Sequence, residues 1–147
     1  MNKPACEFPL KNATTAEVRQ ILANAKTIAV VGLSDRPDRE SHQVAAYLQQ
    51  AGYRIIPVNP NVTAVLGEPA YPNLRAIPVP VDVVDIFRKA EAVPEIVEDA
   101  IAIGARAMWM QQGIVHNAAA ERARRAGMAV VMNKCMMREH RAWQAER

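Results

Sequence analysis

Residues 28–60 read IAVVGLSDRPDRESHQVAAYLQQAGYRIIPVNP. The stretch begins with a β-branched apolar run and turns at Gly32 into a polar loop. Apolar residues then recur at helical spacing over 41–50, and Gly52 follows as a helix terminator. A second apolar run occupies 54–58. The stretch therefore predicts a strand, a crossover helix and a second, parallel strand.

The same alternation runs through the rest of the chain. Near-continuous apolar runs, typical of strands covered on both faces, lie at 27–31, 54–58, 81–86, 107–110 and 128–132. Helical patterns begin after Thr14 or Thr15 as a cap, at about Ser41, near Pro94, and over about 115–126 and 134–144. Residues 59–80, rich in Pro and Asn, read as a long loop with one helical turn. The pattern predicts an α/β fold, a doubly wound five-stranded parallel sheet in a Rossmann-like three-layer sandwich.

Length and composition describe one globular domain. The 147 residues are 50% hydrophobic and 22% charged, and we expect a single domain over 1–147 with its core at about 14–145. No apolar run approaches the roughly 18 residues that a membrane helix needs, and polar residues interrupt the first fifteen. These features predict no membrane partner and a cytoplasmic protein. Cys6 and Cys135 lie too far apart for a CxxC motif and read as reduced thiols.

The positive charge is unevenly placed. The chain has a formal net charge of +3, but residues 122–147 hold seven basic and two acidic residues. The remainder of the chain is therefore slightly negative. A solvated helix face explains such a segment better than a nucleic-acid footprint, so the pattern disfavours a nucleic-acid partner.

The turn after the first strand carries the strongest chemical signal. Gly32 allows a tight turn and a close approach to a phosphate, and the start of the next helix favours an anion. Ser34 adds a hydroxyl, and Arg36 and Arg39 can meet phosphate charge. The alternative is an ordinary strand-to-helix turn with solvated arginines. Within a doubly wound fold, phosphate binding is the favoured interpretation.

Two missing features argue against NAD as the ligand, and a third argues against ATP hydrolysis. The dinucleotide motif GxGxxG is missing, since Gly32 stands alone in this turn. The acidic residue that binds the NAD ribose is also missing, because the second strand runs into Asn59 and Pro60. The Walker pattern does not occur either.

At this point the chain resembles a known family. The runs VVGLSDRPDRESHQVAAYLQQAGYRIIPVNP, VLGEPAYPNL, VDVVDIFR and NKCMMREH resemble the small stand-alone CoA-binding-domain proteins, over about 26–140. That family is in turn similar to the CoA-binding domain of the succinyl-CoA synthetase alpha subunit. The resemblance implies coenzyme A or an acyl-CoA as the ligand.

The resemblance also implies which residues contact that ligand. The pyrophosphate and the start of the pantetheine arm would lie along Gly32, Leu33 and Ser34, with Arg36, Arg39, Ser41 and His42 beside them. The adenosine end would contact Val58, Asn59, Pro60, Phe87 and Arg88, and the pantetheine would pass Gln112 and Gly113. One position departs from the family: many relatives carry a basic residue where this chain has Asn61. The 3′-phosphate would then depend on Arg88 or Arg39.

Other reactive side chains fit structural roles better. His140 shares a helix face with Met136 and Trp143, which favours packing over ligation. His116 reads as a surface residue, and the scattered histidines form no metal motif. His42 could act in catalysis and Cys135 in redox chemistry, but a hydrogen-bonding histidine and a structural thiol are the simpler interpretations.

The sequence thus predicts a module that binds coenzyme A or an acyl-CoA and has no catalytic residues of its own. Two alternatives stay open: an acyl-CoA-handling or redox enzyme that uses Cys135 or His42, and a nucleotide or NAD(P) binder. A homodimer is a further expectation, with Met136 or Trp143 on an exposed face of the last helix as the contact.

Overall fold

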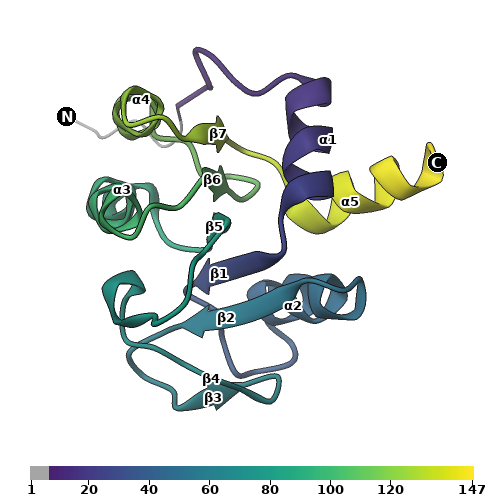
Figure 1. The fold of residues 1–147 in the computed structure, drawn as a ribbon, viewed down its shortest axis with the longest axis vertical. Helices are drawn as coiled ribbons and strands as arrows, with labels where there is room; N and C mark the ends of the chain where they lie inside the picture. Colours follow the sequence, from purple (N-terminus) through teal and green to yellow (C-terminus); the bar gives the residue numbers. More distant parts are fainter. Residues whose placement is uncertain (1–6) are drawn as a thin grey trace.

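Five parallel strands form one sheet in the order β2-β1-β5-β6-β7 (Figure 1). The computed structural model describes residues 7–147. The strands are β1 (Thr27–Val31), β2 (Arg54–Val58), β5 (Val83–Ile86), β6 (Ala107–Met110) and β7 (Ala129–Val131). All neighbours in this sheet pair in parallel, so the predicted parallel sheet is confirmed. The strands predicted at 81–86 and 128–132 are shorter at their ends.

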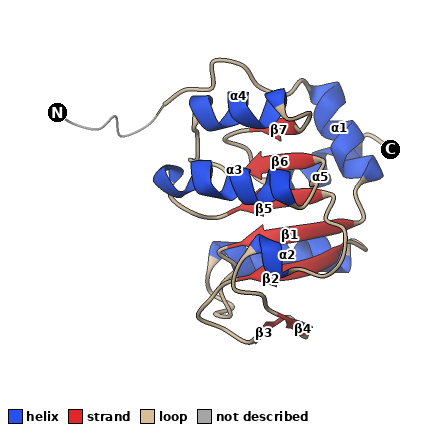
Figure 2. Ribbon diagram, turned by 60° about the vertical axis from the view of Figure 1, so that its left-hand side comes forward, coloured by secondary structure: helices blue, strands red, loops and turns tan. Residues whose placement is uncertain are grey.

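Helices cover both faces of the sheet and complete three layers (Figures 1 and 2). They are α1 (Thr15–Asn24), α2 (Glu40–Gln50), α3 (Val93–Ala102), α4 (Asn117–Arg125) and α5 (Met136–Ala145). In Figure 1, α3 and α4 lie on the left of the sheet, and α1, α2 and α5 on the right. The doubly wound Rossmann-like sandwich predicted from the sequence is therefore confirmed.

Local chemistry fixes where α1 and α4 begin. The Thr14 hydroxyl accepts a hydrogen bond from the Glu17 N–H at 3.1 Å, and the Glu17 carboxylate accepts one from the Thr14 N–H at 2.7 Å. This capping box satisfies two N–H groups that a helix start leaves unpaired. At α4 the Nδ1 atom of His116 accepts a hydrogen bond from the Ala119 N–H at 3.0 Å. His116 is thus a helix cap, and it is half-buried.

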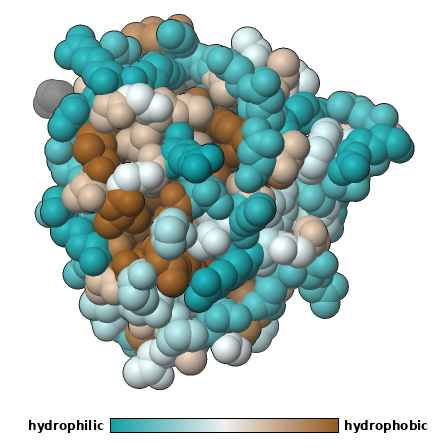
Figure 3. All heavy atoms as spheres, viewed as in Figure 1, coloured by the Kyte–Doolittle hydropathy of each residue, from teal (hydrophilic) through white to brown (hydrophobic). Residues whose placement is uncertain are grey.

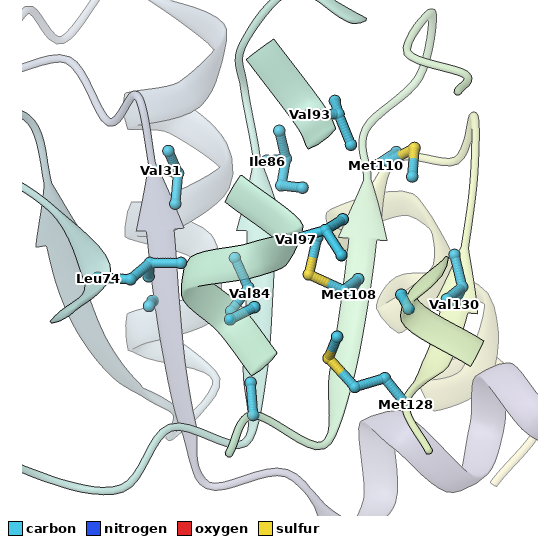
Figure 4. Close-up of a cluster of buried hydrophobic side chains, with 14 of the residues drawn as sticks. Val31, Leu74, Val84, Ile86, Val93, Val97, Met108, Met110, Met128 and Val130 are labelled. Carbon is cyan, nitrogen blue, oxygen red and sulfur yellow. The ribbon is translucent and has the colours of Figure 1, made fainter. Parts of the chain in front are cut away.

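Two apolar cores lie on the two faces of the sheet. Met108 and Met110 point to the α3–α4 side, where they meet Val84, Ile86 and Val97 (Figure 4). Trp109, between them in β6, belongs to the other core with residues of α1, α2 and α5. Strand side chains alternate between faces, so a strand covered on both must be apolar throughout. That requirement explains the near-continuous apolar runs in the sequence.

The segment predicted as a loop over 59–80 contains a small hairpin. Strands β3 (Ala64–Val65) and β4 (Glu68–Pro69) pair antiparallel at the lower end of the molecule (Figure 2). The two residues between them, Leu66 and Gly67, have φ values of 55° and 78°. Positive φ at both positions is typical of a type I′ hairpin turn. The single helical turn expected in this segment is present as a 3-10 turn at Leu74–Ala76.

Both edges of the sheet receive contacts from non-strand segments. Beside β7, the Asn12 side chain donates to the Met132 carbonyl at 2.8 Å and accepts from the Met132 N–H at 2.9 Å. Beside β2, Tyr71 forms an isolated bridge with Val58.

None of the helices described is both long and apolar enough to cross a lipid bilayer. Cys6, predicted to be a reduced thiol, lies outside the described residues.

Candidate functional site

The candidate site lies where the strand order reverses direction. β1 has β2 on one side and β5 on the other, so the connection after β1 leads one way, to β2, and the connection after β5 leads the other way, to β6. Open α/β sheets bind ligands in the crevice at such a switch point. A cavity of about 460 Å³ occupies this position. Its lining residues are Val31, Gly32, Val58, Asn59, Pro60, Asn61, Pro72, Asn73, Leu74, Arg88, Glu95, Ile96 and Asp99.

Apolar and polar surface alternate around this cavity. In the view of Figure 3, apolar side chains gather at and below α3, with hydrophilic residues around them. Val31, Val58, Leu74 and Ile96 supply apolar surface to the cavity, and Arg88 supplies a cation. A cavity of this size with a few polar groups is typical of a small-molecule site.

The turn at Gly32 takes the conformation predicted from the sequence. Its φ is 88°, in the region where residues with a side chain are strained. The Gly32 N–H donates to the Val58 carbonyl at 2.9 Å, which fixes the turn against the end of β2. The Cδ atom of Arg88 lies 3.0 Å from the point where a Cβ of Gly32 would stand. Arg88 therefore lies directly against this turn.

The loop that follows is held by its own serines. The Ser34 N–H donates to Ser41 Oγ at 3.0 Å, and Ser34 Oγ accepts from the Arg36 N–H at 3.0 Å. Ser41 is buried in the first turn of α2, whereas Ser34 is half-buried. Leu33 is fully buried, and its side chain packs in the core. Its carbonyl accepts a hydrogen bond from Asn59 Nδ2 at 3.0 Å.

The start of α2 is open to an anion. Arg39 is the N-cap residue, and no side chain caps the helix there. The first N–H groups of such a helix and its dipole favour negative charge. Arg39 is exposed, His42 is half-buried, and Arg36 lies 3.4 Å from Asp38 in an exposed ion pair. The two arginines are thus placed on the loop as the sequence predicts.

The structure gathers only part of the predicted set around the cavity. Gly32, Val58, Asn59, Pro60 and Arg88 line it. Phe87 is half-buried and packs against the core on the other face of the sheet, because side chains alternate along β5.

Gln112 and Gly113 are exposed in the loop after β6 and do not line the cavity. The Gly113 N–H donates to Asn133 Oδ1 at 2.7 Å, which ties this loop to the end of β7. Buried Gln111 lies just before them, and its Oε1 accepts from the Met136 N–H at 3.2 Å. The loop therefore reaches the start of α5.

Sequence reasoning missed the contribution of α3 to the cavity. Glu95 and Asp99 line it from one side of that helix, with Ile96 between them. Their i, i+4 spacing was visible, but only the packing of α3 beside β5 shows which side faces the cavity. Asn73 and Leu74, from the segment after the hairpin, were missed as well.

Candidate reactive groups outside the cavity are buried. Cys135 is 5% exposed at the N-cap of α5. His140 is buried, its Nδ1 lies 2.8 Å from the Tyr47 hydroxyl, and burial lowers the pKa of its imidazole. Among residues 7–147 no group of three or more His, Cys, Asp or Glu side chains could hold a metal.

Asp85 is the most unusual titratable residue of the sheet. It is fully buried in β5, and neither carboxylate oxygen has a hydrogen-bond partner. Loss of hydration therefore raises the pKa of this carboxyl well above its ordinary value of 3.8. A neutral carboxyl group is the expected form within this core.

Comparison with known proteins places these features in context. Residues 26–141 match the family model described as "CoA binding domain". The uncharacterised protein YneT of Bacillus subtilis is 43% identical over 131 residues, covering 89% of this chain and 97% of that protein. An ADP-forming acetate–CoA ligase (II) of Archaeoglobus fulgidus is 34% identical over 76 residues, which are 50% of this chain and 11% of the ligase.

A solved structure shares nearly the whole chain. A hypothetical protein from Pyrococcus horikoshii OT3 has a TM-score of 0.88 and 39% sequence identity. The alignment covers 98% of this chain and 99% of that protein. The family match spans both the Gly32 turn and the strands that frame the cavity. The chain belongs to the CoA-binding-domain family, and it shares its fold with this small relative over nearly the whole length of both chains.

Proposed function

We propose that this chain binds coenzyme A or an acyl-CoA at the carboxyl ends of β1, β2 and β5, as a non-catalytic binding or regulatory module. One observation carries the proposal: in a member of a CoA-binding family, the switch-point cavity joins the Gly32 turn, the Arg88 side chain and the end of β2. The proposal extends to the domain organisation, with residues 1–147 as one binding domain.

The phosphates would lie at the Gly32 turn. The uncapped start of α2 offers N–H groups there, and Arg88 lies against the turn. Arg36 and Arg39 are exposed on the adjoining loop and can approach the same anion. Fully buried Leu33 would anchor the turn in the core, and Ser34 and Ser41 would hold the loop in shape.

The two organic ends of the ligand would leave the turn in different directions. The adenosine would enter the cavity against Val58, Asn59 and Pro60. The pantetheine would pass over the loop of Gln112 and Gly113, on the other side of the switch point. Phe87 would support this arrangement from the core rather than touch the adenosine.

A binding module fits the site better than an enzyme. Cys135 is buried at the start of α5. Among residues 7–147, His42 forms no hydrogen bond or ion pair with a carboxylate or a thiol. The resemblance to the acetate–CoA ligase covers 11% of that enzyme, so the ligase's name assigns no reaction to this chain.

The structure leaves fewer residues of α5 available for a dimer contact than the sequence suggested. Met136 is fully buried in the core and cannot form a dimer contact, because the start of α5 packs onto the sheet. Half-buried Trp143 is the candidate that is left on that helix. A cytoplasmic location is likewise proposed, and cell fractionation would test it.

Calorimetric titration with CoA, acetyl-CoA and NAD tests the function. We expect CoA to bind, and a hundredfold excess over Kd to stabilise the fold by about 2.7 kcal/mol, or roughly 5–10 °C. Arg88→Gln should raise Kd about tenfold, the value of one charge-assisted hydrogen bond. Arg54→Gln is the matched control, because Arg54 is exposed at the opposite end of β2.

The same titration separates the alternatives. Absence of CoA binding, or equal losses in the two arginine variants, would contradict the proposed site. Tighter binding of NAD than of CoA would favour the nucleotide alternative. Hydrolysis or transfer of the acetyl group, lost on changing Cys135 or His42, would make the protein an enzyme.

A further inference from the structure

Three of the six polar side chains that line the cavity already make hydrogen bonds within the protein. Asn59 donates to the Leu33 carbonyl and accepts from the Asn61 N–H at 2.8 Å. Asn73 Oδ1 accepts from the Ala76 N–H at 3.0 Å. Asp99 Oδ1 accepts from Arg75 Nε at 2.7 Å, so that ion pair balances its own charge. Asn59 and the charge of Asp99 are therefore committed to the protein, whereas among residues 7–147 nothing bonds to Asn73 Nδ2.

Three lining side chains have no such partner among residues 7–147. They are the guanidinium of Arg88, the amide of Asn61 and the carboxylate of Glu95, and all three residues are exposed. A ligand in the cavity therefore meets one unpaired cation, one unpaired anion, the Asn61 amide and the Asn73 amide nitrogen. Arg88 lies against the Gly32 turn, which is the proposed position of the pyrophosphate.

This set is poorly suited to a second phosphate group. A phosphate monoester carries a charge of about −1.5 to −2 at pH 7 and would need a further cation. Neither Arg36 nor Arg39 lines the cavity. Asn61 offers no charge, and Glu95 would repel the group. A carboxylate is well suited to the hydroxyls of an unmodified ribose, which donate hydrogen bonds to it. In dinucleotide-binding folds such a carboxylate follows the second strand. Here the lining carboxylate without a partner among residues 7–147 is Glu95 of α3.

We propose that the cavity recognises an adenosine diphosphate unit whose ribose carries free 2′ and 3′ hydroxyls, with Glu95 accepting hydrogen bonds from them. The inference rests on the proposed function and refines its ligand class to dephospho-CoA and its thioesters. The 3′-phosphate of CoA then contributes nothing to affinity.

Paired titrations with CoA and dephospho-CoA test the inference. We expect dephospho-CoA to bind at least as tightly as CoA. Glu95→Gln should weaken dephospho-CoA about tenfold and leave CoA unchanged or tighter, since it removes both the acceptor charge and the repulsion. Asn61→Lys should shift the preference toward CoA about tenfold, because it places a cation in the cavity.

The control variant lies on the same helix. Glu98→Gln removes an equal charge from α3, but Glu98 pairs with Arg122 at 2.9 Å and does not line the cavity. It should leave both affinities unchanged. Thermal melts of each variant would show that the fold is intact.

The outcomes separate this inference from the proposed function. If CoA binds more than about tenfold tighter than dephospho-CoA, the inference is wrong and the CoA site stands. If neither ligand binds, both fail. If NAD or ADP binds as tightly as dephospho-CoA, the ribose contact stands, and the pantetheine contributes nothing. Equal effects of Glu95→Gln and Glu98→Gln would remove Glu95 from the site.

Discussion

Gly32 stands in direct contact with the end of β5: a Cβ at Gly32 would lie 2.6 Å from the carbonyl oxygen of Phe87. Hydrogen bonds to both neighbouring strands hold this arrangement. The Gly32 N–H donates to the Val58 carbonyl, and the Phe87 N–H donates to the Val31 carbonyl, each at 2.9 Å. The three strand ends that frame the cavity therefore meet at a position where only glycine fits.

Gly32→Ala should destabilise the fold by about 2–4 kcal/mol, from backbone strain at positive φ plus the clash with Phe87. Gly127→Ala isolates the strain, because Gly127 has a φ of 94° and no atom within 4 Å of its Cβ position. This control should cost about 1–2 kcal/mol. Urea unfolding of both variants makes the comparison, and equal losses would contradict the steric argument.

The buried carboxyl of Asp85 should make stability fall as the pH rises. Below pH 3.8 the group is protonated in both the folded and unfolded states. Above that pH the unfolded chain ionises, whereas the raised pKa keeps the folded carboxyl protonated. The free energy of unfolding then falls by up to about 1.4 kcal/mol per pH unit, until the folded pKa is reached.

Asp85→Asn should remove this slope while preserving the side-chain shape. Its stability relative to the native protein should increase between pH 4 and pH 8. Chemical unfolding at several pH values measures it. A constant difference across that range would show that Asp85 ionises freely in the fold.

His140 should give a slope of the opposite sign. Burial, and to a lesser extent the charge of Arg147, lower the pKa of this imidazole below 6.5. As the pH falls through 6.5, His140 is protonated in the unfolded chain but stays neutral in the folded chain. The free energy of unfolding therefore decreases. The free energy of unfolding should fall by at most about 1.4 kcal/mol per pH unit, and His140→Gln should reduce this slope.

Tyr47→Phe is the control for His140. It removes the hydroxyl that lies 2.8 Å from Nδ1 and leaves the titrating ring in place. The slope between pH 7 and pH 5 should therefore persist in Tyr47→Phe. If His140→Gln retains the full slope, another group is responsible for it.

Cys135 should react slowly with thiol reagents in the folded protein. The measurement needs a Cys6→Ser background, so that one thiol reports. Because Cys135 is 5% exposed, labelling should require opening of the structure and should accelerate with denaturant. Rapid formation of a mixed disulfide with oxidised CoA under native conditions would instead support the redox alternative.

The sequence predicted the central fold because its signals are local. Apolar runs between helical patterns marked all five strands of the sheet, and Thr14 or Thr15 was expected to cap α1, where the structure has Thr14. The strand predicted from 81 begins at Val83, because the Asp82 carboxylate accepts hydrogen bonds from the Lys26 and Thr27 N–H groups at 2.9 and 3.0 Å. Such a contact across 55 residues is invisible in a pattern.

The sequence did not predict the β3–β4 hairpin or about half of the residues that line the cavity, for two different reasons. Two-residue strands show no periodicity, and Leu66-Gly67 lacks the Asn-Gly or Asp-Gly signature of a tight turn. Glu95 and Asp99 lie on a helix whose pattern predicts only which side packs inward. Their position beside Arg88 follows from the packing of α3 against the sheet, which no local signal encodes.

The contact between Asn12 and Met132 has a consequence for how copies of this chain can meet. One amide side chain makes the pair of hydrogen bonds that an incoming strand would make at this border of the sheet. Tyr71 does the same for the opposite border, at Val58. Segments of the same chain thus bond to both edges of the sheet, which disfavours edge-to-edge pairing of sheets from different molecules. We expect copies of this chain to associate through surfaces other than these two edges of the sheet.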